Sequence, residues 1–213
     1  MKIQSYVLGI VSTNCYIVSN ENTKEAIIFD PADQASVITD LLKEQDLHPV
    51  AILLTHGHFD HIMAADEVAN YYHIPVIAGE AEKELLADPD LNGGYMIRKN
   101  ITLKADQLIQ DKDQITLAGL KIQMIHTPGH TAGGMCYYFD KEKILISGDT
   151  LFLESVGRTD LPTGNAKTLI ESIKQKLMVL PDDVMVCPGH GDRTTIGYER
   201  THNPYVGDND FWD

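Results

Sequence analysis

The sequence predicts an α+β fold in which two β-sheets pack face to face and helices cover the outside. Short β-type segments followed by helical segments occur twice in the 213 residues, the pattern of two layered units that share one core. The length suits one sizeable domain. Because no repeat, low-complexity tract or linker interrupts the pattern, we expect a single domain over residues 1–213.

Four runs in the first half have the length and composition of β-strands. They lie at residues 3–8, 14–19, 25–29 and 50–54. Residues 34–45 place apolar side chains on one face of a helix, and Asp33 is predicted to be its N-cap. A second helix is predicted over residues 62–72.

The middle of the chain is less regular. A short strand at 74–78 and a short helix at 81–86 precede residues 87–105, which contain a proline, two glycines and no clear period. Such a stretch is either a loop over a functional site or a plain surface connection.

The second half returns to β-type runs, of which the first two are predicted to form a hairpin. These runs lie at residues 114–117, 121–126, 135–139, 144–147 and 184–187. A helix is predicted over residues 166–180, because its leucines and isoleucines fall on one side.

The charge balance narrows the possible partners. There are 17 basic and 31 acidic residues, a formal net charge of −14. So acidic a surface repels phosphate backbones, and we expect no nucleic-acid substrate. The composition, 43% hydrophobic and 23% charged, is that of a globular protein.

The cysteines and the N-terminus indicate the compartment. Cys15, Cys136 and Cys187 are widely spaced among apolar residues, so we expect buried, reduced thiols. No apolar run approaches the roughly 20 residues that span a bilayer, and the N-terminus lacks the apolar core of a signal peptide. We expect a cytoplasmic protein without membrane contact.

One stretch, residues 55–61, concentrates side chains that bind metals. It follows the apolar strand at 50–54 and precedes the helix at 62–72, so it lies on a strand-to-helix loop. Three histidines and an aspartate fall within six of its residues. Imidazole nitrogens and carboxylate oxygens bind Zn²⁺ at about 2.0 to 2.2 Å, so this density predicts a metal site rather than a chance cluster.

The spacing within the stretch predicts two ions. In extended backbone His56 and His58 point to the same side and can share one ion. Asp60 and His61 come a turn later and can hold a second. Gly57 is expected to let the backbone pass close to the metal.

Three further residues share this setting. Asp149 and His190 lie just past apolar strands in glycine-containing turns, and His130 follows Pro128-Gly129. Strand ends converge on one edge of a layered sheet, where sites usually form. We assign the seven residues to two sites with Asp149 as the bridge: His56, His58 and His130 in the first, and Asp60, His61 and His190 in the second. His48, His73, His126 and His202 lack the setting and are predicted not to be ligands.

This ligand pattern resembles that of the metallo-β-lactamase superfamily. The resemblance covers most of the chain and implies an αββα sandwich, with two mixed sheets face to face and a binuclear metal site at one edge. Residues 127–131, 148–152 and 188–191 are similar to those of the glyoxalase II group, the hydroxyacylglutathione hydrolases. Residues 156–162 resemble the signature of the short bacterial branch of that group.

The resemblance implies two substrate contacts, each with an alternative. Tyr137 matches a tyrosine that the family uses near glutathione, or it is an ordinary strand tyrosine. Arg158 could hold a substrate carboxylate as a fork, or it forms a structural ion pair with Asp160.

The expected activity is metal-dependent hydrolysis of a small-molecule thioester. Two divalent ions, zinc first but iron or manganese also suitable, would activate a water, and Asp60 would bind metal and orient the nucleophile. The alternatives are a persulfide dioxygenase with one iron, a lactonase or esterase of the same fold, and a non-catalytic metal-binding protein.

Overall fold

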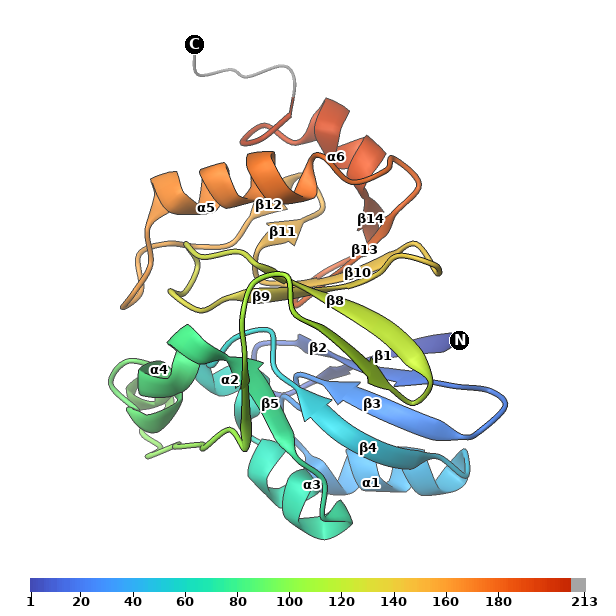
Figure 1. Cartoon of the computed structure of the whole chain (residues 1–213). Coiled ribbons are helices and arrows are strands. Elements are labelled where there is room, and N and C mark those ends of the chain that lie inside the picture. The colour runs from blue at the N-terminus through green and yellow to red at the C-terminus, as the bar shows by residue number, and fades with distance from the viewer. Residues whose placement is uncertain (208–213) are drawn as a thin grey trace.

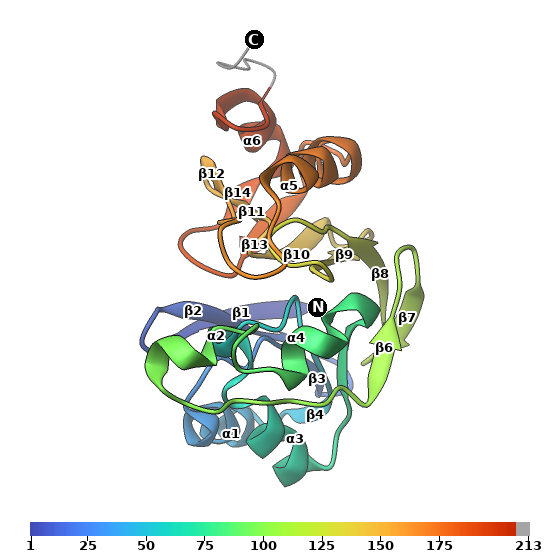
Figure 2. The same cartoon turned by 90° about the vertical axis from the view of Figure 1, so that its left-hand side faces the viewer.

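The structure, a computed structural model, describes residues 1–207, so positions 208–213 of the predicted domain lie outside the described residues. Two six-stranded sheets pack face to face, and helices cover both outer faces (Figure 1). Figure 2 shows the four layers from the side. The predicted αββα sandwich with two mixed sheets is confirmed.

The first sheet is built from the first half of the chain, in the order β1-β2-β3-β4-β5-β6. Its strands are β1 Lys2–Leu8, β2 Thr13–Ser19, β3 Glu25–Phe29, β4 His48–Leu53, β5 Val76–Gly79 and β6 Gln107–Ile109. The pairs β1–β2 and β2–β3 are antiparallel, whereas β3, β4, β5 and β6 run parallel.

The second sheet has the order β14-β13-β10-β9-β8-β7. Its strands are β7 Gln114–Leu117, β8 Leu120–His126, β9 Met135–Phe139, β10 Ile144–Gly148, β13 Met185–Pro188 and β14 Thr194–Thr195. Strands β10 and β13 are parallel and the others antiparallel. A small hairpin, β11 Leu151–Phe152 and β12 Ser155–Val156, follows β10.

The helices fall into two outer layers and a group of short turns near one edge (Figures 1 and 2). The first sheet is covered by α1 Ala35–Glu44 and α3 Ala65–Tyr72, and the second by α5 Ala166–Ser172, which continues as the π-helix η3 Ile173–Leu177, and by α6 Ile196–His202. The short turns are α2 Phe59–Ile62, η1 Glu80–Glu82, α4 Lys83–Ala87 and η2 Gly94–Ile97.

Three apolar layers hold the sandwich together. The middle layer, between the sheets, contains the large buried rings of Tyr16, Phe29, Tyr137 and Phe139. Burying such a ring stabilises a fold by about 1.5 to 3 kcal/mol. The three cysteines are buried and free, as predicted.

Several local expectations need correction. The predicted cap Asp33 is wrong: Gln34 occupies the cap position in a left-handed conformation, and the Asp33 carboxylate only accepts from the Gln34 amide. The helix expected over 62–72 is divided into α2 and α3, because the Ala64 amide donates to the Pro31 carbonyl. Strands β6, β11, β12 and β14 were not predicted, since two or three residues carry no readable alternation.

Both sheets bring strand ends to one edge. Strands β3 and β4 end there because they are parallel, as do β10 and β13. Two backbone hydrogen bonds join the sheets at this edge, Met135 N to Thr55 O at 2.8 Å and Asn14 N to Gly189 O at 2.7 Å. Within residues 1–207, no helix is long and apolar enough to cross a membrane.

Candidate metal centre

Three histidine side chains meet at the edge between the sheets. His56 and His58 lie on the loop after β4, and His130 lies on the loop after β8. The Nε2 atom of His130 is 2.9 Å from Nδ1 of His58 and 3.2 Å from Nε2 of His56. All three side chains are buried. We call these three residues cluster one.

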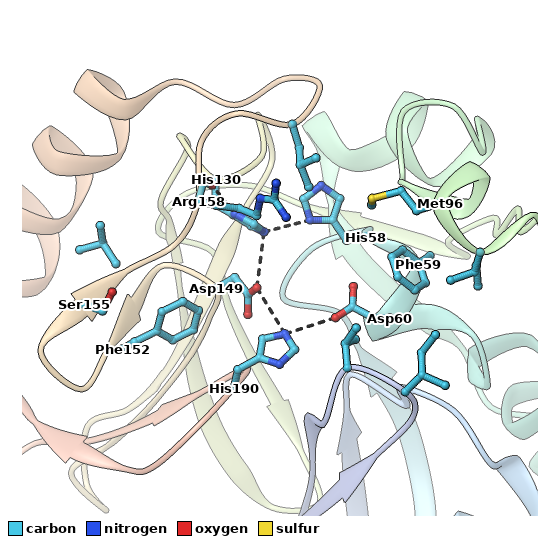
Figure 3. A pocket seen from close by; sticks show the side chains of 15 residues that line it. His58, Phe59, Asp60, Met96, His130, Asp149, Phe152, Ser155, Arg158 and His190 are labelled. Atoms are coloured by element: carbon cyan, nitrogen blue, oxygen red, sulfur yellow. Dashed lines mark hydrogen bonds and ion pairs between the residues drawn. The ribbon is translucent and has the colours of Figure 1, made fainter.

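The other four candidate ligands lie beside it. Asp60 Oδ2 is 3.5 Å from His61 Nε2 and 3.2 Å from His190 Nε2, and we call these three residues cluster two. The Asp149 carboxylate lies between the clusters, with Oδ1 3.5 Å from His61 Nε2 and Oδ2 3.6 Å from His130 Nε2 and 3.5 Å from His190 Nε2 (Figure 3). The structure thus brings together all seven residues in the predicted grouping.

The donor set fits divalent metal ions. Ligand atoms placed tetrahedrally at about 2.1 Å from an ion lie about 3.4 Å apart, close to the spacings within both clusters. His61 Nε2 and Asp149 Oδ1 are buried and have no hydrogen-bond partner among the described residues. Buried polar atoms are rarely left unpaired, so these two atoms indicate a ligand that the protein itself does not supply.

Hydrogen bonds from the protein fix which ring nitrogen is free in three of the five histidines. Asp30 accepts the Thr55 hydroxyl proton at 2.6 Å, so that hydroxyl can only accept from His56 Nδ1, at 3.1 Å. His61 Nδ1 donates to Asp30 Oδ2 at 2.9 Å, and His130 Nδ1 donates to a backbone carbonyl at 2.7 Å. The Nε2 lone pairs of these three rings are therefore left for the centre.

The sequence did not single out Asp30. It follows β3 directly, and its buried carboxylate also accepts from the Thr55 amide at 2.7 Å. The available signal was its position, because an acidic residue past a strand parallel and adjacent to β4 must lie beside the loop at 55–61.

Glu82 is a second residue that the sequence did not reveal. Its fully buried carboxylate accepts from Gly57 N at 2.8 Å, Thr131 Oγ1 at 2.6 Å and Gly133 N at 2.7 Å. Burial raises its pKa although the three donors oppose the shift. One side chain thus joins the loop that carries His56 and His58 to the loop that carries His130.

Two glycines are required by close packing. A Cβ at Gly57 would lie 2.7 Å from a Leu85 methyl group, so close packing against α4 requires a glycine here, and the expected close approach to the metal stays a prediction. A Cβ at Gly189 would lie 2.1 Å from Asp149 Oδ1 and 2.7 Å from the His61 ring. Gly189 therefore makes room for the carboxylate between the clusters.

The two clusters differ in charge. Burial and the neighbouring imidazoles hold the pKa of His56 well below its usual value, and burial followed by His130 lowers the pKa of His58 to about 3. Burial would also lower the pKa of His61, but Asp60, Asp149 and Asp30 outweigh it and raise that pKa to about 10. Without metal, the low pKa values of His56 and His58 leave these two rings neutral, whereas His61 in cluster two is cationic among carboxylates.

The predicted substrate contact of Tyr137 is contradicted. Its side chain is fully buried in the layer between the sheets, and its hydroxyl donates to the Leu54 carbonyl at 2.6 Å. Alternation along β9 turns this side chain inward, away from the pocket. Arg158 does line the pocket, and it forms the alternative interaction, an ion pair with Asp160 through two hydrogen bonds of 2.7 and 2.8 Å.

A pocket of about 540 Å³ opens over the centre. Met96 and Ile97 line it, so residues 87–105 do form a loop over the site. Phe59 and Met96 lie on one side of the ligands and Phe152 and Ser155 on the other (Figure 3). None of the three cysteines lines it, and burial raises the pKa of the Cys136 and Cys187 thiols to about 11.

Curated relatives match nearly the whole chain. A probable metallo-hydrolase, YqgX of Bacillus subtilis, is 40% identical over 208 residues, covering 97% of this chain and 98% of its own. The hydroxyacylglutathione hydrolase GloC of Haemophilus influenzae is 32% identical over 209 residues, covering 97% and 98%.

Solved structures agree. The B3 metallo-β-lactamase BLEG-1 is 43% identical with a TM-score of 0.92, covering 96% of this chain and 99% of its own. TTHA1623, solved in a di-iron-bound form, is 33% identical with a TM-score of 0.84, covering 95% and 100%. Residues 8–190 match the metallo-β-lactamase superfamily. The ligand geometry, the fold and these matches together show that the chain belongs to the metallo-β-lactamase superfamily.

Proposed function

We propose that the protein is a metal-dependent thioester hydrolase whose chemistry is that of the hydroxyacylglutathione hydrolases. The observation that carries the proposal is the position of Asp149 between two complete ligand clusters, under a pocket open to a small molecule. The similarity to GloC supports the substrate class.

In the proposed centre, cluster one would hold one divalent ion, cluster two a second, and Asp149 would contact both. When bound, the ions would lower the pKa of a water toward neutrality and polarise the substrate carbonyl. Zinc is our first choice. The similar di-iron structure and the histidine–carboxylate donors make iron an alternative, and the donors would also accept manganese.

The protein's own residues would orient the attacking water and accept its proton. Thr13 Oγ1 donates to Asp60 Oδ2 at 3.0 Å and fixes that carboxylate at the pocket floor, where it would orient the attacking water and take its proton. Apolar walls would exclude bulk water from the reacting carbonyl. The thiolate is a good leaving group, so its departure would require no protein acid.

The test is thiol release by purified, zinc-loaded protein. The substrates are S-D-lactoylglutathione and the uncharged S-acetyl-N-acetylcysteamine, each with and without a chelator. We expect release that the chelator abolishes and that returning zinc restores. No release from either thioester, with two metal ions bound, would overturn the proposal.

β-Lactam hydrolysis is a second candidate, favoured by the 43% identity to BLEG-1. The same water attack would open the strained amide, and hydrolysis of a chromogenic cephalosporin measures it. A persulfide dioxygenase needs one iron with open positions, which the complete second cluster disfavours. Oxygen uptake with glutathione persulfide by the iron-loaded protein would favour that alternative.

A further inference from the structure

The walls of the pocket are apolar beyond the metal ligands. Apart from five ligand residues, the lining contains Ser155, Arg158 and a set of eight apolar side chains. These eight are Ile10, Val11, Phe59, Met96, Ile97, Phe152, Val156 and Leu161. They come from four separate segments: the turn between β1 and β2, the start of α2, the loop at 87–105, and the stretch from β11 to Leu161.

Part of this wall is exposed to solvent. The exposed fractions are 71% for Ile10, 44% for Val11 and 45% for Met96. A contiguous exposed apolar surface around a pocket usually marks a binding site. Covering it with an apolar ligand would remove that surface from water.

Hydrogen bonds hold the part of the wall that comes from the loop at 87–105 in place. The Asn92 side chain donates to the Ile101 carbonyl at 2.8 Å and accepts from the Gly94 amide at 2.9 Å, which ties the loop together. The Asn92 carbonyl also accepts from the Phe59 amide at 2.9 Å, which joins the loop to the metal-ligand stretch.

The wall offers little to an anionic substrate. Arg158 is the one cationic side chain among the lining residues outside the ligands, and Asp160 already holds its guanidinium by two hydrogen bonds. The chain carries a formal net charge of −14. A glutathione thioester brings two carboxylates, which would need cationic partners on this wall.

We propose that the preferred substrate is a thioester with an apolar, medium-length acyl chain on an uncharged thiol portion. This inference rests on the thioesterase function proposed above and names its substrate class. The acyl chain would cover Ile10, Val11 and Met96 while the thioester carbonyl lies over the metal centre.

A chain-length series tests the inference. The substrates are acetyl, butyryl, hexanoyl and octanoyl thioesters of N-acetylcysteamine, with S-D-lactoylglutathione for comparison. Each methylene that becomes buried should raise kcat/KM roughly three- to fourfold. A flat or falling series, or fastest turnover of lactoylglutathione, would overturn the inference while leaving the thioesterase function intact.

If no thioester is hydrolysed, the proposed function fails, and a binding measurement still decides whether the pocket wall takes an apolar chain. Calorimetric titration of the metal-loaded protein compares octanamide with acetamide, neither of which presents a thioester. Tighter binding of octanamide supports the apolar site, and equal or undetectable binding of both overturns it.

Serine variants of two wall residues, with a valine outside the pocket as control, localise the effect. Val11→Ser and Met96→Ser should lower the octanoyl-to-acetyl ratio of kcat/KM by about threefold or more. Val179→Ser changes an equally small apolar side chain, 70% exposed and outside the pocket, and should keep the wild-type ratio. An unchanged ratio in Val11→Ser and Met96→Ser would remove these residues from the acyl site.

Discussion

Cluster one and cluster two share Asp149, yet they are held in different ways. Cluster one consists of three imidazoles, and its two loops are joined through the buried carboxylate of Glu82. Cluster two contains the carboxylate of Asp60, and the charged network around it includes Asp30. Cluster one therefore depends on the packing of two loops, whereas cluster two depends on the attraction between its charged groups.

The largest effect is expected at Asp60, whose carboxylate would serve both as a metal ligand and as the catalytic base. Asp60→Asn keeps the size of the side chain but removes the carboxylate that would bind metal and take a proton. Thioester hydrolysis should fall by about a hundredfold or more while circular dichroism stays native. Turnover near the wild-type rate would show that Asp60 has neither role.

The next largest effect is expected on the number of metal ions bound per chain, which distinguishes cluster one from cluster two. His130→Ala removes a ligand from cluster one only, so the metal content should fall from two ions per chain toward one. Elemental analysis measures it. His126→Ala is the matched control, since this ring contacts the Ala132 carbonyl and belongs to neither cluster. Two ions bound to His130→Ala would take His130 off the ligand list.

A smaller effect on metal binding is expected at Asp30, whose carboxylate accepts a hydrogen bond from the cluster-two residue His61. Asp30→Asn weakens the acceptor of His61 Nδ1, and such changes cost about 10- to 100-fold in metal affinity. Competition with a chelating dye should show the loss in one of the two ions. Asp40→Asn, on an exposed face of α1, should bind both ions normally. Equal affinities in the two variants would mean that Asp30 does not support cluster two.

The smallest effect is expected from the packing of cluster one. Glu82→Gln replaces one carboxylate oxygen by an NH₂ group, which faces the protein's hydrogen-bond donors and cannot accept from them. Because one buried hydrogen bond is lost, the free energy of unfolding should fall by about 1 to 3 kcal/mol. Chemical denaturation measures this against Glu84→Gln, an exposed neighbour on α4. Identical stability of the two variants would show that Glu82 does not hold the loops together.

Residues of the centre that are close together in the sequence could be predicted, whereas those that depend on distant contacts could not. His56, His58, Asp60 and His61 stand within one loop, so their grouping could be inferred from spacing. His130, Asp149 and His190 could be added because each follows a strand. Asp30 and Glu82 could not, since their roles arise from contacts with residues 25 or more positions away.

The amino-acid sequence was sufficient to predict the two-sheet fold, the candidate metal-ligand residues and their division into two groups. Those features depend on local periodicity and on residue types that few other purposes explain. Three features became visible only in the folded molecule: Tyr137 points into the core, Glu82 joins two loops, and the pocket wall is apolar. Each of these depends on which side chains from distant segments meet, because burial and contact are properties of the packed molecule and not of local sequence.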